Sequence, residues 1–362
     1  MKNRMKRLTL IKTTILILII SAAGFISCND KPEPQPLPYS VLSTLNLLQE
    51  NPQFVMYLNF KNMRRTVFWQ KNVSDSILNS EKTFGSLLNT FKLATGASIS
   101  DGLDELYYSN SWFGENAIVI KGVIDRSKLI KYITEDSLFS VAREIDGKTI
   151  YMKNDNGLYF YFRDNNTICA SNYLKQIDLM INVKDTSETG LLQNEKVLNS
   201  IKNIVYKDDM WMVSTERFFI RGIFQNFLLS TSGIKTESND SSDSPESGLI
   251  NDSAASKDKP TVENIYKRFS AISFSSKMSE NLNLLIQCEC INEESSKFLR
   301  SILNGLISVA KLNSAGNKKQ NSLKFLDDLK INRYDNSVFI DLIVDDNNIS
   351  ELRKTNLINE PE

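Results

Sequence analysis

The order of expected strands and helices constrains this chain most, because the same order occurs twice. In each half the hydrophobic periodicity predicts strand, helix, strand, strand, helix, strand and strand. In the first half these are 54–60, 75–94, 106–111, 116–123, 127–135, 139–145 and 148–154. In the second half they are 210–215, 217–229, 270–278, 282–291, 293–312, 330–334 and 337–345. We expect an α+β fold with largely antiparallel sheets and helices packed on one face.

Short turns and local echoes support a duplication. Asp146-Gly147 and Asp335-Asn336 each separate two short strands, and such pairs favour tight hairpins whose turn positions need positive φ. Two stretches of the first half echo two of the second: 114–130 resembles 279–299, and 143–151 resembles 332–340. We therefore expect two copies of one β-α-β-β-α-β-β unit. Chance recurrence of common elements is the alternative.

The predicted units are 44–184 and 185–350. An extra hairpin over 157–171, followed by helices over 173–182 and 193–203, is expected to join them. Residues 231–260 hold eight serines and few large apolar side chains, which predicts a disordered insertion. The alternative for this insertion is a recognition segment that folds on binding. A fraying tail is expected over 351–362.

The helix expected over 293–312 has an apolar face that must pack on a sheet. Asn292 is its expected N-cap. The helix also contains Ser308-Val309-Ala310-Lys311, an S-x-x-K match to serine acyl-enzymes. Ser308 is expected almost opposite the apolar face, and the chain has no K-T-G motif, so we interpret the match as chance.

Cys28 lies where an apolar stretch ends and a proline-spaced segment begins. Basic residues at positions 2, 4, 6, 7 and 12 precede an apolar run over 15–26, which Ser27 and Cys28 follow. This order resembles the signal peptide of bacterial lipoproteins, whose cysteine is lipidated and becomes the mature N-terminus. The resemblance implies a signal peptide over 1–27 and a palmitate-type lipid on Cys28. Phe25 departs from the leucine usual in that family.

An uncleaved membrane anchor and cleavage without lipidation are the alternatives at this site. A spanning helix needs about 20 apolar residues, which the run lacks. Ordinary cleavage needs a small residue three places before the cut, where Phe25 stands. Downstream, prolines at 32, 34, 36 and 38 predict an extended tether over 28–43. Such a tether would hold the folded part roughly 20 Å from the membrane.

Composition excludes several classes of function. The 362 residues include no histidine, which excludes Ser-His-Asp and Cys-His catalysis and zinc sites that use histidine. Carboxylate pairs, Ser-Lys dyads and oxygen-ligated metals remain open. Without the signal peptide, 38 basic residues face 43 acidic ones, so no basic surface for nucleic acid is expected. We predict no metal, no cofactor and no nucleic-acid partner.

The other cysteines are interpreted as core residues. With Cys28 lipidated, an odd number remains: Cys169, Cys288 and Cys290. Cys288 and Cys290 alternate with polar residues onto the apolar face of one expected strand, where cysteine packs as a small hydrophobe. Whether Cys169 pairs with Cys288 or with Cys290 stays open at this point.

Four phenylalanines crowd the helix expected over 217–229. They are Phe218, Phe219, Phe224 and Phe227. An aromatic stripe is usually core. The functional alternative is a partly exposed apolar interaction patch, because large exposed apolar patches mark interaction sites.

The chain is similar in layout to uncharacterised envelope lipoproteins of the Bacteroides type, which are described only as domains of unknown function. The shared features are the signal sequence that ends at Cys28, the linker, the hairpins and the strand end KGVID (121–125). The resemblance implies an envelope location and a duplicated α+β architecture, and no activity. We expect a non-enzymatic binding or structural module, anchored by lipid to a membrane, with the outer membrane favoured and its face left open. Its partner would be an envelope protein or an apolar ligand. The alternatives are a histidine-independent hydrolase of envelope polymers that uses acidic residues, and a lipid carrier.

Overall fold

The computed structural model describes residues 31–73, 102–184, 189–222, 265–316 and 328–354. The chain divides into two compact units, Met1–Glu33 and Pro34–Glu362. In the first unit only residues 31–33 are described, and they form no helix or strand. The expected signal peptide with Cys28, the helix over 75–94 and the insertion over 231–260 lie outside the described residues.

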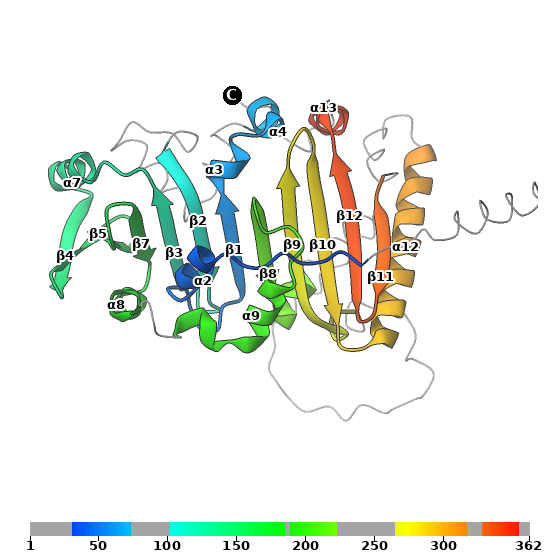
Figure 1. The fold of residues 1–362 in the computed structure, drawn as a ribbon, viewed down its shortest axis with the longest axis horizontal. Helices are drawn as coiled ribbons and strands as arrows, with labels where there is room; N and C mark the ends of the chain where they lie inside the picture. The colour runs from blue at the N-terminus through cyan, green and yellow to red at the C-terminus, as the bar shows by residue number, and fades with distance from the viewer. Residues whose placement is uncertain (1–30, 74–101, 185–188, 223–264, 317–327, 355–362) are drawn as a thin grey trace, which may run out of the picture. The chain divides into compact units, whose positions relative to one another are not determined.

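The second unit is built on one twelve-stranded sheet in which all neighbouring strands are antiparallel (Figure 1). The strand order is β11-β12-β10-β9-β8-β1-β2-β3-β7-β6-β5-β4. The strands are β1 (Phe54–Asn59), β2 (Leu103–Asn110), β3 (Asn116–Gly122), β4 (Phe139–Ile145), β5 (Lys148–Lys153), β6 (Leu158–Phe162), β7 (Thr167–Ser171), β8 (Met210–Ser214), β9 (Phe269–Met278), β10 (Leu282–Cys290), β11 (Lys330–Tyr334) and β12 (Ser337–Val344).

Helices flank this sheet, which confirms the α+β class. They are α2 (Tyr39–Leu45), α3 (Phe60–Met63), α4 (Val67–Asn72), α7 (Arg126–Glu135), α8 (Leu174–Asn182), the 3-10 helix η2 (Gly190–Gln193), α9 (Glu195–Lys202), α12 (Glu293–Gly316) and α13 (Asp346–Lys354). α13 extends into the segment expected to be a fraying tail. Among the described residues, no helix has the length and hydropathy needed to cross a membrane.

β1 and β8 join the two predicted halves of the chain. They pair antiparallel, with Val55 opposite Val213 and Tyr57 opposite Trp211. From this pair, β2 and β3 follow in one direction and β9 and β10 in the other (Figure 1). Residues of both predicted units therefore share one sheet.

The hairpin expected over 157–171 is present as β6 and β7, within the range 44–184 predicted for the first unit. β7 pairs with β3, with Val119 opposite Cys169. The hairpin of β4 and β5 is thereby placed at the edge of the sheet. In the second half, β12 pairs directly with β10. Both tight turns are present: Asp146 and Gly147 have positive φ as predicted, whereas in the second turn only Asp335 does.

Helices cover both faces of the β1–β7 part of the sheet, so the expectation of helices on one face is wrong. On β3, Ile118 belongs to one buried cluster and its neighbour Val119 to another. α7 adds Leu129 to the first cluster, while α8 and α9 add Ile177 and Ile201 to the second. The physical reason is that β3 and β7 carry apolar side chains at successive positions, and both faces of such strands need cover.

α12 packs where its apolar face predicts, against the β9–β12 end of the sheet. Leu299 and Leu303 join a third buried cluster that includes Cys288 and Val338. The helix begins after Asn292, whose side-chain oxygen accepts a hydrogen bond of 2.8 Å from the Ser295 amide. This is the expected N-cap.

Candidate functional site

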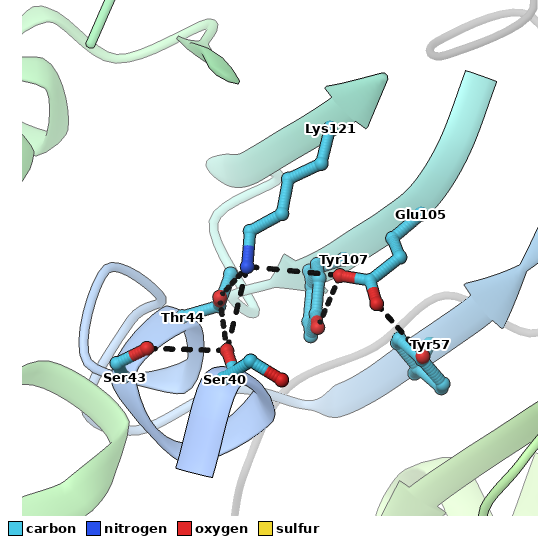
Figure 2. Close-up of polar contacts among 7 residues, drawn as sticks. All are labelled: Ser40, Ser43, Thr44, Tyr57, Glu105, Tyr107 and Lys121. Carbon is cyan, nitrogen blue, oxygen red and sulfur yellow. Dashed lines mark hydrogen bonds and ion pairs between the residues drawn. The ribbon is translucent and has the colours of Figure 1, made fainter. Parts of the chain in front are cut away.

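A cluster of polar side chains lies between the sheet and α2, and we call it the Glu105 cluster (Figure 2). Its members are Ser40, Thr44, Tyr57, Glu105, Tyr107 and Lys121. β-Strand register brings four of them together, because Tyr57 lies opposite Tyr107 and Glu105 lies opposite Lys121. Residues two apart share a face, so these four side chains point to the same side of the sheet.

The carboxylate of Glu105 is the centre of this cluster. Its Oε2 accepts a hydrogen bond of 2.9 Å from the Tyr107 hydroxyl, and its Oε1 accepts one of 3.4 Å from the Tyr57 hydroxyl. The Lys121 ammonium lies 3.6 Å from Oε2. The negative charge of Glu105 is thus paired with one cation, and both of its oxygens accept hydrogen bonds. A carboxylate in a partly buried site needs such partners, because burying an unpaired charge is costly.

Lys121 also holds α2. Its Nζ donates to the Thr44 hydroxyl at 2.5 Å and to the Ser40 carbonyl at 3.4 Å. The ammonium lies 5.2 Å from the centre of the Tyr107 ring, within range of a cation–π interaction. The first helix after the proline-spaced segment is therefore held to the sheet by hydrogen bonds from Lys121 as well as by its buried Val41 and Leu45.

The two tyrosines stay neutral in this environment. Burial, followed by the charge of Glu105, raises the pKa of both Tyr57 and Tyr107 well above the usual tyrosine value. Each phenol therefore keeps its proton at physiological pH, donates a hydrogen bond to Glu105 and does not supply a tyrosinate base or nucleophile. The arrangement is suited to positioning α2.

Three exposed aromatic side chains lie in the β2–β3 turn and shortly after β8, and we call them the aromatic patch. Trp112, Phe113 and Phe218 are 48 %, 91 % and 64 % exposed. The rings of Trp112 and Phe218 meet edge to face, with centroids 5.9 Å apart. The Trp112 indole N–H donates to Glu216 at 3.2 Å, which joins the β2–β3 turn to the segment that holds Phe218.

The turn that carries Trp112 and Phe113 is internally hydrogen-bonded. The Ser111 amide donates to the Glu115 carbonyl at 2.7 Å, and the Phe113 amide donates to the Ser111 hydroxyl at 3.3 Å. From outside the turn, the Asn172 side-chain amide donates to the Gly114 carbonyl at 2.8 Å. Because this turn is already ordered, contact of the exposed Phe113 ring with a binding partner would cost little further conformational entropy of the turn.

The four predicted phenylalanines do not act as one set. Phe218 lies on the aromatic patch, whereas Phe219 is half-buried and stacks on Phe54 with centroids 5.1 Å apart. Phe224 and Phe227 lie outside the described residues. Sequence reasoning missed Trp112 and Phe113. The available signal was two large aromatic residues inside a short hairpin loop, where small polar residues are usual.

The described carboxyls with raised pKa values do not converge. Burial raises the pKa of Asp209, Glu289 and Asp341. Asp209 accepts from the amide of Met278, which pairs with Leu282 at the start of β10. Glu289 stands seven residues further along β10, or about 23 Å at the usual rise of a strand. Asp341 pairs with Leu285, which lies between Leu282 and Glu289 along β10. The close carboxylate pair that the hydrolase alternative needs is not formed by these three residues.

The three described cysteines are buried and free. Cys169 lies on β7 and the other two on β10, six strand steps away in the sheet order, or roughly 29 Å at the usual strand spacing. A disulfide needs Cα atoms within about 7 Å, so Cys169 pairs with neither. Burial raises the pKa of Cys169 to about 11 and that of Cys290 to about 12, which makes the reactive thiolate scarce at neutral pH.

A pocket of about 270 Å³ lies between the connection that follows α2 and helix α8. Leu47, Leu48 and Leu179 are among its apolar lining residues, and Gln176 among its polar ones. Pockets for small ligands usually span about 300–1,000 Å³, so this one suits at most a small molecule. Within the described ranges, no group of three Cys, Asp or Glu side chains is placed to hold a metal ion.

No family model matches the chain, and no curated protein sequence matches it. Solved structures that resemble it in fold include crystal forms of TP0453, a treponemal protein. Form I has a TM-score of 0.44 and 8 % identity, covering 87 % of this chain and 97 % of that chain. Forms III and IV have TM-scores of 0.42 and 0.43 with 9 % identity, covering 85 % and 87 % of this chain and 95 % and 96 % of theirs. Values this low assign no family, ligand or activity.

Proposed function

We propose that this chain is a membrane-anchored lipoprotein of a bacterial envelope, lipidated at Cys28, that works as a non-enzymatic binding module. Its contact surface is the aromatic patch, and its partner is an envelope protein. The observation that carries the binding role is the exposure of Phe113, Phe218 and Trp112 in one hydrogen-bonded corner of the fold.

Exposing three aromatic rings together is costly unless a partner covers them. Burying one such side chain stabilises a complex by roughly 1.5–3 kcal/mol. Tryptophan and tyrosine are among the residues most often found as binding hot spots, and clustered apolar exposure marks interaction surfaces. A docked protein would remove the Phe113 and Phe218 rings from water without disturbing the hydrogen bond between Trp112 and Glu216.

We further propose that the two halves of the fold arose by duplication. The support is the strand order, in which β1, β2 and β3 leave the central strand pair in one direction while β8, β9 and β10 leave it in the other. A helix and a hairpin then follow β3 and β10 in each half. The halves differ in the β6–β7 hairpin, which would be an addition to the first copy.

Loss of the proposed lipid should detach the protein from its membrane. We expect wild-type protein in the membrane fraction and Cys28→Ala protein in the soluble fraction, because several acyl chains are needed for lasting attachment. The measurement is fractionation followed by washing at high salt, and detergent extraction of the wild-type pellet serves as the control against aggregation. A wild-type protein whose intact mass shows no acyl group on Cys28 would exclude lipid anchoring through this cysteine.

Removing the aromatic patch should abolish partner capture while leaving the fold intact. We place a photoreactive amino acid at the exposed Arg217 and crosslink in intact membranes. The double variant Phe113→Ser/Phe218→Ser is expected to lose the adduct that wild type forms. Its free energy of unfolding should stay within about 0.5 kcal/mol of wild type per site, as is usual for exposed positions.

A matched control separates the aromatic patch from general surface hydrophobicity. Tyr39 and Val123 are 74 % and 73 % exposed and lie outside the patch. Tyr39→Ser/Val123→Ser should keep the adduct. If both double variants form the adduct as wild type does, the patch is not the contact surface.

A further inference from the structure

A buried lysine holds the proline-spaced segment ahead of α2. The Lys207 side chain is only 4 % exposed. Its Nζ donates a hydrogen bond to the carbonyl of Gln35 and another, of 2.7 Å, to the carbonyl of Lys202 at the end of α9. The C-terminal end of a helix carries partial negative charge and favours a cation there.

The proline-spaced segment has more backbone hydrogen-bond acceptors than donors. Pro34, Pro36 and Pro38 have no amide N–H, so the segment cannot join the sheet as a regular strand. Leu37 is half-buried against the second core cluster, and the Pro38 carbonyl accepts from the amides of Val41 and Leu42 as α2 begins. A lysine donor directed at the Gln35 carbonyl is therefore a suitable way to hold the segment down.

We infer that Lys207 is a latch that sets the free length of the membrane tether; this inference rests on the proposed lipid at Cys28. With the latch closed, the free segment runs from Cys28 to Gln35, and a polyproline segment of that length spans about 22 Å. With the latch open, it runs to Leu37, whose side chain packs against the second core cluster, and its span rises to about 28 Å. The second fastening, of α2 by Lys121, is unaffected.

The latch can be tested by spin-label mobility in the full chain, purified with Cys28→Ala so that no lipid and no thiol remain at position 28. Gln35 is exposed and contributes its backbone carbonyl to the latch, so Gln35→Cys can carry a nitroxide without removing the contact. The described cysteines are buried, which keeps labelling specific. We expect a slowly tumbling label with Lys207 present and several-fold faster tumbling in Lys207→Met, because the segment then moves as a flexible chain.

Two controls make the outcome decisive. Lys202→Met keeps the latch, because Lys202 contributes only its backbone carbonyl. The label at position 35 should therefore tumble as slowly in Lys202→Met as in the protein that retains Lys202. A label at Arg217→Cys should have the same mobility with and without Lys207→Met, which shows that the sheet end remains folded. Equal mobility at position 35 with and without Lys207→Met would overturn the latch. Because this measurement is made without the lipid, its failure is distinguishable from failure of the proposed anchoring, which the fractionation of Cys28→Ala tests.

Discussion

Gly190→Ala should destabilise the fold by about 2–4 kcal/mol, from a strained φ and from overpacking. Gly190 has a φ of 53°, and a Cβ placed there would lie 2.4 Å from the Leu48 carbonyl oxygen and 2.5 Å from that of Asn46. Both obstacles are backbone atoms. They are hard to displace because the Asn46 side chain accepts two hydrogen bonds of 2.7 Å from Thr189, the neighbour of Gly190.

Urea denaturation gives the free energy of unfolding that checks this expectation, and Gly114→Ala is the matched control. Gly114 has a φ of 77°, yet a Cβ there would meet no atom within 4 Å. Its cost should be about 1–2 kcal/mol, from the backbone conformation alone. Equal losses for the two variants would show that the contact of Gly190 with the connection after α2 does not constrain the fold.

Lys121→Met should cost about 2–3 kcal/mol, because it leaves the partly buried Glu105 without its cation. The Lys121 and Glu105 side chains are 25 % and 22 % exposed, so water replaces the lost partner poorly. The variant also removes the hydrogen bonds from Lys121 to Thr44 and to the Ser40 carbonyl. We therefore expect faster amide exchange in α2 as well as a lower free energy of unfolding.

The double variant Lys121→Met/Glu105→Gln should recover part of the lost stability. The oxygen of a neutral glutamine can still accept from one tyrosine hydroxyl, its NH2 can donate to the oxygen of the other, and no unpaired charge then remains. Lys128→Met is the control, because the Lys128–Asp125 pair is exposed on both sides and such pairs contribute roughly 0–1 kcal/mol. Loss of stability in the double variant equal to that in Lys121→Met would assign the effect to α2 packing instead of the charge on Glu105.

Local features of the fold could be predicted wherever neighbouring residues decide the structure. Asp146-Gly147 predicted its hairpin because few other residues adopt positive φ readily. Asn292 and the apolar face of α12 predicted a helix that begins at Glu293. The periodicity also predicted β9 and β10 to within about one residue at each end.

The arrangement of these elements could not be predicted in the same way. Helices were expected on one face, yet Ile118 and Val119 on adjacent positions of β3 enter different cores. The hairpin of β6 and β7 was expected, but its pairing through β7 with β3 was not. Strand pairing between residues about 50 positions apart depends on packing across the whole sheet, which no local pattern records.

The same distinction between local pattern and long-range contact applies to the candidate sites. Phe218 was noticed for its composition, but only the edge-to-face contact with Trp112, about a hundred residues away, makes it part of a surface. No sequence motif marks the Glu105 cluster. Glu105 and Lys121 meet because β2 and β3 pair in one register, and a shift of one residue between the two strands would place the two side chains on opposite faces of the sheet.

The amino-acid sequence is enough to predict an α+β chain with tight hairpins, a capped amphipathic helix, buried cysteines and no histidine chemistry, because these properties depend on composition and on residues close together in the chain. Tertiary structure alone decided that β1 and β8 unite the halves in one sheet, that Lys121 fastens α2, that Lys207 holds Gln35, and that Trp112, Phe113 and Phe218 share a surface. Each of these contacts joins distant segments. Their formation depends on burial and register summed over the whole fold.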